Sequence, residues 1–162
     1  MTTIRTEPLT AAAFAPFGQV LAAEGPPDRL INRGLCGRWH DRAALDFGPD
    51  GRAGISVFLA EPRALPYDCD LLERHPEGSQ AFLPLHAHPF LVIVAPDAGG
   101  IPGAPRAFVT DGAQGINLAR GTWHGVLTPL AAPGLFAVID RIGPTPNLQE
   151  HPLPRPFRVI AA

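Results

Sequence analysis

The sequence predicts an all-β protein with one minor helix, and three observations lead to this class. Glycine (17 residues) and proline (20 residues) fall between short apolar segments, as turns do between strands. Apolar residues make up 46% of the 162 residues, which is enough for a buried core. No long segment with a helical apolar period separates the strand candidates, so a sandwich, a barrel or a jelly roll is expected rather than βαβ units.

The expected elements follow one another along a single domain, residues 1–162. A short helix begins after Thr10, which can cap it, runs through an alanine-rich segment and ends near Pro16. Turn-forming glycine, proline and aspartate residues then separate segments of strand length. Six of these segments are expected to form sheet: residues 55–60, 81–85, 90–95, 106–110, 115–119 and 135–140.

The C-terminal segment is rich in proline. Residues 144–156 hold five prolines, and proline cannot donate a hydrogen bond to a neighbouring strand. This segment is therefore expected to form an extended arm that does not join a central strand. Residues 157–161 are expected to form one last strand, paired on a sheet edge or across a dimer.

Composition excludes several classes of chemistry and partner. All 13 basic residues are arginine, so lysine Schiff bases and the phosphate-binding lysine loop are excluded. The formal net charge is −2, which offers no basic surface for nucleic acid. Cys36 and Cys69 have no metal-knuckle spacing and are expected to be buried small apolar residues. With no leader-like N-terminus and no membrane-length apolar run, we expect a cytoplasmic protein without membrane contact.

Three of the six histidines have a suggestive arrangement. His86 and His88 lie between two strand candidates and share a strand face if the strand continues through them, and His124 follows 36 residues later. Three imidazoles from neighbouring strands can form a facial ligand set for zinc, nickel, manganese or iron. The alternative is a polar hairpin tip with solvated histidines. His124, beside Trp123 in an apolar stretch, is the stronger candidate for an inward-facing functional histidine.

Polar side chains also gather ahead of the strand at residues 81–85. Glu73, Arg74 and His75 are consecutive, and Gln80 follows them. A surface turn with ion pairs is the simpler explanation, and a functional site is the other. Arginine here and at Arg38 carries a planar fork that suits carboxylates, which makes an anionic substrate physically reasonable.

Several strings must be considered together: residues 32–41, 72–76, 80–84, 106–108, 114–117, 121–124 and 139–141. In this combination they resemble the ureidoglycolate lyase family, and the resemblance spans nearly the whole chain. It implies a cupin-like double-stranded β-helix (a jelly-roll barrel), a homodimer, and cleavage of (S)-ureidoglycolate to glyoxylate and urea in allantoin breakdown. The spacing of His86, His88 and His124 is also similar to cupin metal motifs, but the glutamate that follows the first motif in cupins is missing.

The resemblance carries site assignments with it. His124 is expected to act as acid/base or metal ligand, with His75 or Glu73 as its acid/base partner. The substrate carboxylate is assigned to Arg74 or Arg38. Gln80 and Asn117 are expected to hydrogen-bond the ureido group. A divalent metal, nickel or another, is an open option with His86, His88 and His124 as ligands, and no organic cofactor is expected.

Two other functions compete with the lyase. One is a different metal-dependent cupin enzyme, a dioxygenase or an isomerase, which the His86 and His88 pair favours and the missing glutamate disfavours. The other is a cupin that binds a ligand without catalysis. The retro-addition itself needs only proton transfer, for which histidine has a suitable pKa.

Overall fold

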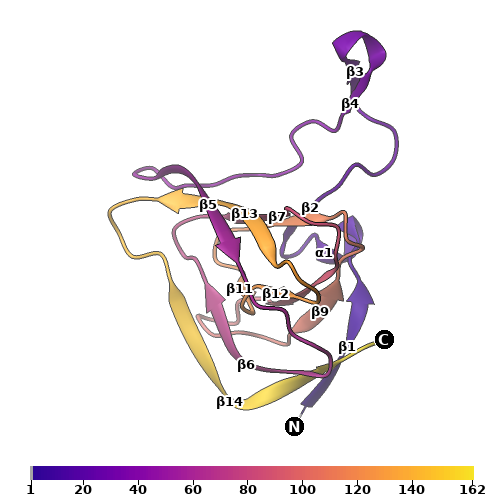
Figure 1. The fold of residues 1–162 in the computed structure, drawn as a ribbon. Helices are drawn as coiled ribbons and strands as arrows, with labels where there is room; N and C mark the ends of the chain where they lie inside the picture. Colours follow the sequence, from indigo (N-terminus) through magenta and orange to yellow (C-terminus); the bar gives the residue numbers. More distant parts are fainter. Residues whose placement is uncertain (1) are drawn as a thin grey trace.

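The computed structural model describes residues 2–162 and consists almost entirely of strands (Figure 1). Its two helical elements are the one-turn α1 (Ala11–Phe14) and a 3-10 turn, η1 (Asn32–Gly34). The strands, in chain order, are β1 (Thr2–Pro8), β2 (Gly18–Leu21), β3 (Arg29–Ile31), β4 (Cys36–Arg38), β5 (Arg52–Leu59), β6 (Tyr67–Arg74), β7 (Gln80–Pro84), β8 (Phe90–Ala95), β9 (Arg106–Val109), β10 (Gly115–Leu118), β11 (Trp123–His124), β12 (Thr128–Pro129), β13 (Leu135–Ile142) and β14 (Gln149–Ile160).

The strands form a closed barrel with a second sheet beside it. The seven-stranded sheet has the order β11-β6-β14-β1-β9-β8-β12, and β11 also pairs with β8, which closes the ring. The five-stranded sheet has the order β2-β10-β7-β13-β5, and β3 with β4 forms a separate hairpin. This confirms the all-β class predicted from the sequence and is consistent with a cupin-like fold.

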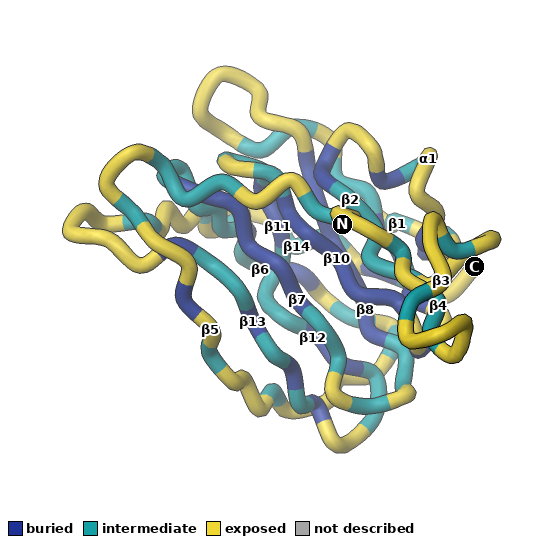
Figure 2. The backbone as a smooth tube through the Cα atoms, turned by 90° about the horizontal axis from the view of Figure 1, so that it is seen from above, coloured by how far each residue is buried: buried dark blue, intermediate teal, exposed yellow. Residues whose placement is uncertain are grey.

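Strand β8 shows why the molecule has two apolar layers. All six of its residues are buried, because successive side chains of a strand point to opposite faces and both faces are covered here. Phe90, Val92 and Val94 face the five-stranded sheet, whereas Leu91 and Ile93 belong to the cluster that fills the closed barrel. Figure 2 shows the buried parts of β7, β8 and β10 running through the middle of the molecule.

The predicted elements are largely confirmed. The helix begins after Thr10, whose side chain accepts a hydrogen bond from the Ala13 amide. All six predicted strands are present within three residues of the expected bounds, as β5, β7, β8, β9, β10 and β13. Cys69 is buried as expected, but Cys36 lies in β4 and is only half-buried.

The last strand expected at residues 157–161 is present as the end of β14, but it lies between β6 and β1 rather than on a sheet edge. The expectation of an extended arm before it is wrong, because β14 already begins at Gln149, and residues 149–152 pair with β6. Its prolines are tolerated because the pairing with β6 shifts register between Pro152 and Phe157, where no regular ladder is required. Regular pairing resumes at Phe157 opposite Cys69.

The hairpin of β3 and β4 projects from the body as an arm (Figure 1). Two aliphatic side chains of the arm are exposed, Leu30 to 63% and Leu35 to 90%. The chain then returns along residues 39–51 to enter β5. Within residues 2–162, none of the helices has the length and apolarity that crossing a membrane requires.

Candidate active site

Strand pairing brings three polar side chains together near the end of β6, on the side of the seven-stranded sheet that faces the five-stranded sheet. Glu73 near the end of β6 lies directly opposite His124 of β11, and His75 follows β6. The ligand atoms of these three residues all lie within 4.8 Å of one another. The imidazole rings of His75 and His124 are 5.2 Å apart between centroids. We call Glu73, His75 and His124 the acid–base cluster.

Backbone carbonyls determine the tautomers of both histidines. His75 Nδ1 lies 2.7 Å from the Asn147 carbonyl oxygen, and His124 Nδ1 lies 3.0 Å from that of Gly125. A carbonyl oxygen can only accept, so Nδ1 of each ring carries the proton and Nε2 keeps its lone pair. Both Nε2 atoms are buried and have no hydrogen-bond partner. They are thus available to a substrate or a metal ion.

Burial lowers the pKa of His124 and raises the pKa of Glu73. His124 is 3% exposed, and burial lowers its pKa to about 4, with the neighbouring His75 acting in the same direction. Burial raises the pKa of the Glu73 carboxyl, the nearby His75 opposes that change and Glu150 adds to it. At neutral pH His124 is therefore a neutral base beside a carboxyl that holds its proton more strongly than usual.

Gln80 faces the same layer as His124. In an antiparallel ladder directly opposed residues share a face, and Gln80 lies opposite Leu118 while His124 lies opposite Val94. Leu118 and Val94 both belong to the apolar layer between the sheets. Gln80 Nε2 donates to an Asp140 carboxylate oxygen at 3.2 Å, and its own oxygen is buried without a partner. The free oxygen is suited to accept an N–H from a ligand.

The acid–base cluster fits a divalent cation. Two imidazole nitrogens and one carboxylate oxygen are a ligand set typical of divalent metal sites. Each imidazole donates its other N–H to a backbone carbonyl, which is the usual outer support of a ligating histidine. The unpartnered Nε2 atoms provide the donors that such an ion needs.

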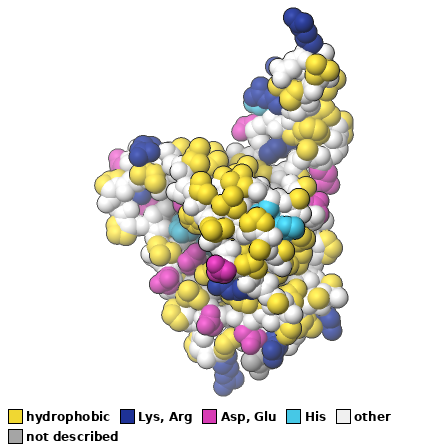
Figure 3. Space-filling view, viewed as in Figure 1, with side chains coloured by type: hydrophobic (Ala, Val, Ile, Leu, Met, Phe, Trp, Pro, Cys, Tyr) yellow, Lys and Arg dark blue, Asp and Glu magenta, His cyan; other side chains and the backbone are white. Residues whose placement is uncertain are grey.

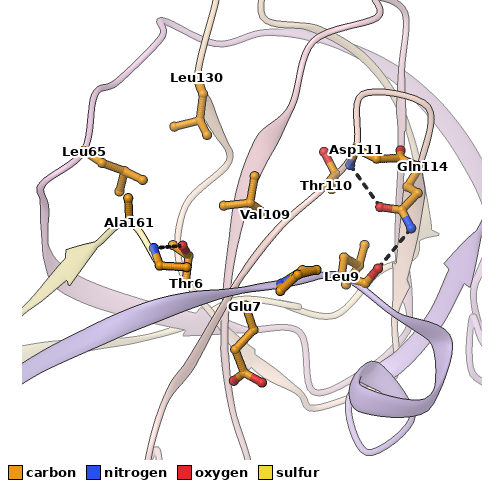
Figure 4. A pocket seen from close by; sticks show the side chains of 12 residues that line it. Thr6, Glu7, Leu9, Leu65, Val109, Thr110, Asp111, Gln114, Leu130 and Ala161 are labelled. Atoms are coloured by element: carbon orange, nitrogen blue, oxygen red, sulfur yellow. Dashed lines mark hydrogen bonds between the residues drawn. The ribbon is translucent and has the colours of Figure 1, made fainter.

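A separate cavity of about 500 Å³ is lined by residues outside the acid–base cluster (Figure 4). It is bordered by Val109 of β9, three residues after Arg106, which lies opposite Val94, the strand partner of His124. Its polar groups satisfy one another, since Gln114 bonds the Leu9 carbonyl and the Asp111 amide. The Glu7 side chain points away from it in Figure 4 and pairs with Arg106. No histidine is among its twelve lining residues, so it offers no comparable proton-transfer site.

Comparison with known proteins identifies the family. The sequence profile described as "Ureidoglycolate lyase" matches residues 1–160. The chain belongs to the ureidoglycolate lyase family. It is 62% identical over 159 residues to the ureidoglycolate lyase of Rhodobacter capsulatus, covering 98% of this chain and 99% of that protein. Relatives of the same name in Chelativorans sp. and, as ureidoglycolate lyase 2, in Rhizobium meliloti are each 48% identical, with at least 94% of both chains covered.

Of the two arginines that the family resemblance assigned to a carboxylate, neither lies in the acid–base cluster. Arg74 follows Glu73 in β6 and so points to the opposite face. There it donates to an Asp97 oxygen at 2.7 Å and lies over the Trp123 ring at 4.5 Å. Arg38 is on the projecting arm, exposed and away from the barrel (Figure 1).

Asn117 is fully buried, but on the other face of the five-stranded sheet from Gln80. It lies directly opposite Ala81, the neighbour of Gln80, so alternation turns it outwards. Its amide donates to Gln19 at 2.9 Å and to the Ala44 carbonyl at 3.2 Å. These contacts hold the returning segment 39–51 against the sheet.

His86 and His88 form a pair of their own beyond the far end of β7. Their rings are stacked 5.7 Å apart, and His86 Nδ1 accepts a hydrogen bond from the His88 amide. In residues 2–162 the structure brings His124 together with Glu73 and His75, and not with these two histidines. The carbonyl of Asn147, which orients His75, was not expected from the sequence, because any residue type can supply a backbone oxygen.

Proposed function

We propose that this protein is a ureidoglycolate lyase whose acid–base cluster splits (S)-ureidoglycolate into glyoxylate and urea, a step of allantoin breakdown. The observation that carries the proposal is the pairing of a neutral, buried His124 with Glu73 in a chain of this family. Ureidoglycolate is a carbinolamide, so its cleavage is a retro-addition that needs one base and one acid. The cluster contains both.

The reaction begins with proton transfer from the substrate hydroxyl. His124 Nε2 takes this proton, because its lone pair is free at neutral pH. The oxygen electrons then form the carbonyl of glyoxylate as the C–N bond breaks, and the bonding pair moves to nitrogen. Glu73, whose pKa is raised, donates its proton to that nitrogen and releases urea. No water is consumed, and the products contain all atoms of the substrate.

The cluster resets when His124 Nε2 gives up the proton that it took and Glu73 takes one up. Immediately after the reaction His124 is an imidazolium and Glu73 a carboxylate, and His124 Nδ1, which lies 4.0 Å from Glu73 Oε1, keeps its own proton towards the Gly125 carbonyl. Burial disfavours both charges, so these proton transfers restore the neutral pair. His75 lines the same space with its own free Nε2 and is the alternative acid/base. Gln80 offers its oxygen to an N–H of the ureido group.

A divalent metal, nickel or another, is the alternative use of the same cluster, because an ion would occupy the His124 lone pair and the Glu73 carboxylate that the metal-free route uses for proton transfer. His75, His124 and Glu73 would hold it, and when bound it would stabilise negative charge on the substrate hydroxyl oxygen. Calorimetric titration of the untagged protein with Ni²⁺ tests this assignment. We expect His75→Ala to weaken binding about 100-fold or more, since it removes a ligand, while His88→Ala leaves it unchanged. If His88→Ala weakened Ni²⁺ binding and His75→Ala did not, the ion would instead lie at the His86 and His88 pair.

We also propose that the chain acts in the cytoplasm, as a single domain and as a homodimer. An exposed apolar face on the five-stranded sheet supports the homodimer. Ile55, Val57 and Leu59 of β5 are 75%, 67% and 72% exposed on its outer side. Contiguous apolar surface of this kind is typical of protein interfaces.

Product analysis tests the activity directly. The purified protein is expected to release glyoxylate and urea from ureidoglycolate in equal amounts, with no ammonia. His124→Ala should lower kcat by about 10²- to 10⁴-fold while the protein remains folded. Ammonia as the product would indicate hydrolysis, oxygen consumption would indicate a dioxygenase, and binding without turnover would indicate a binding module. The comparisons do not favour the last two functions.

A further inference from the structure

The projecting arm carries two arginines side by side. Arg29 of β3 and Arg38 of β4 are directly opposed in the hairpin, so they lie on the same face with Cβ atoms roughly 5 Å apart. Like charges in this position repel each other unless an anion lies between them. Together with Asp28 and His40 they line a small cavity of about 150 Å³.

These two arginines have no carboxylate partner within residues 2–162. The nearest acid, Asp28, accepts instead from the His40 amide and from Arg42, both at 2.9 Å. Arginine presents a planar fork of N–H donors that matches a carboxylate, and two of them can hold one from both sides. The arm thus offers two guanidinium groups that have no ion-pair partner of their own among the described residues.

The acid–base cluster, by contrast, has acidic neighbours and, in the part of the chain that the structure describes, no arginine to bind a substrate carboxylate. Its acidic neighbours include Glu150, which lies directly opposite Glu73, and Asp140 beside Gln80. Among residues 2–162, Glu73, Glu150 and Asp140 form no ion pair with an arginine. A carboxylate substrate would be repelled by this rim unless a cation accompanied it.

The arginines near this rim are already engaged. Arg74 is held by Asp97 and lies against Trp123. Arg120 donates to the Pro76 carbonyl at 2.7 Å and lies near two surface acids. Arg141 is buried and donates to the Phe47 carbonyl and to Thr145. In the single chain, therefore, none of these three is free to bind a substrate carboxylate.

A second copy of the chain can bring the arm to the site. The outer face of β5, with Ile55, Val57 and Leu59 exposed, follows the arm along the chain, and Figure 3 shows apolar side chains gathered below the arm. A two-fold contact through this face would bury it in both copies and extend each arm over its partner. The positive arm and the acidic rim are complementary in charge.

We propose that, in a dimer, Arg29 and Arg38 of one copy bind the substrate carboxylate at the acid–base cluster of the other copy. The proposal rests on the proposed function for the identity of the substrate, and on the arm geometry for the source of the cation. Each active site would then consist of Glu73, His75 and His124 from one chain and the two arginines from its partner.

Hybrid dimers test this arrangement. Arg38→Ala alone is expected to lower kcat/KM about 10- to 100-fold, mainly through KM, because it removes charged hydrogen bonds to the carboxylate. Dimers that combine an Arg38→Ala chain with a His124→Ala chain, isolated by two different tags, should regain about half of the wild-type activity, because one of two sites is intact. If Arg38 served its own chain, this hybrid would stay inactive.

The matched control is the reciprocal hybrid, in which a wild-type chain is paired with a chain carrying both substitutions. It should be nearly inactive if the arm acts on the partner and about half active if the arm acts on its own chain. Arg155→Ala, an exposed arginine on β14, should leave kcat/KM unchanged.

Two measurements do not depend on turnover. Sedimentation should show a dimer, and a monomeric wild-type protein overturns the arm proposal whatever the reaction. Titration with glyoxylate as a carboxylate probe should give about 10-fold weaker binding or more for Arg38→Ala, and an equal affinity also overturns it. If both expectations hold but ureidoglycolate is not cleaved, the proposed function fails while the shared anion site stands.

Discussion

At the scale of single residues, a buried histidine without its proton is central to the site. His124 can accept a proton because burial stabilises its neutral form, and the Gly125 carbonyl leaves Nε2 as the free nitrogen. The neighbouring residues Glu73 and Arg74 are adjacent in sequence but differ in role. Strand alternation sends Glu73 to His124 and Arg74 to Asp97.

The lowered pKa of His124 predicts a dependence of stability on pH. In the unfolded chain this histidine has its ordinary pKa of 6.5, whereas in the folded protein the pKa is about 4. Between these values the unfolded state binds a proton that the folded state refuses. Stability is therefore retained above about pH 6.5 and lost progressively as the pH falls towards 4, by up to about 3 kcal/mol from this group.

Thermal unfolding of wild type and His124→Gln across pH 4 to 7.5 measures this effect, after dialysis against a chelator. Glutamine cannot titrate, so the wild-type Tm should fall relative to that of the variant by about 5 to 10 °C between pH 6.5 and 4. Glu73 remains in both proteins, which leaves the difference to His124. If the Tm of wild type and of His124→Gln changed in parallel between pH 6.5 and 4, the pKa of His124 would not be lowered in the folded protein.

At the scale of elements, the two-residue strand β11 closes the barrel and places the site. Trp123 pairs with Ala95 in β8, while His124 pairs with Glu73 in β6 and Val94 in β8. The Trp123 ring is 2% exposed in the barrel core, and its Nε1 donates to Asp97 at 2.9 Å. A short strand is sufficient here because a large side chain anchors it.

Substitutions at Trp123 should separate packing from hydrogen bonding. Trp123→Ala is expected to lower the free energy of unfolding by about 3 to 5 kcal/mol, through the cavity it leaves. Trp123→Phe keeps most of the packing and should cost about 1 kcal/mol for the lost hydrogen bond. The alanine variant should also lose kcat, because His124 is the next residue.

Chemical denaturation provides the measurement, and Trp39→Phe is the matched control. Trp39 donates to the Glu24 and Gly25 carbonyls at the base of the arm and does not contribute to the barrel core. Its substitution should leave the free energy of unfolding within about 1 kcal/mol of wild type. An unfolding free energy for Trp123→Ala close to that of wild type would contradict the role given to β11.

Elements with a local signal could be predicted, and those that depend on distant partners could not. The apolar segment of β8 and the Thr10 cap are visible within a few residues. Strand β6 was not predicted, because three of its eight residues are acidic and its partner β14 lies about 80 residues further on. For the same reason the prolines of β14 suggested a free arm, since the register shift that accommodates them exists only in the paired sheet.

The same limit applies to the candidate site. Residue types and family motifs singled out Glu73, His75 and His124, which the structure places together. The face to which a side chain points depends on strand register, so the motifs could not show that Asn117 is turned away from Gln80.

At the scale of the whole molecule, the exposed face of β5 predicts how stability and activity depend on association. Val57 lies in the middle of this face, opposite Ala137, with Ile55 and Leu59 on either side. A charge at this position would be buried without a partner in a dimer contact, which costs several kcal/mol, but would be solvated in a monomer. Val57→Asp is therefore expected to yield a folded monomer.

Sedimentation velocity and kinetics check this prediction together. The variant should sediment as a monomer at concentrations where wild type is dimeric, and the wild-type Tm should rise with protein concentration whereas that of the variant should not. Because the arms then lack a partner, kcat/KM should fall about as far as in Arg38→Ala. Ile101→Asp, at an aliphatic side chain 54% exposed in another loop, is the matched control and should remain dimeric and active. A dimeric Val57→Asp protein would exclude this face as the contact and require another route for the arm.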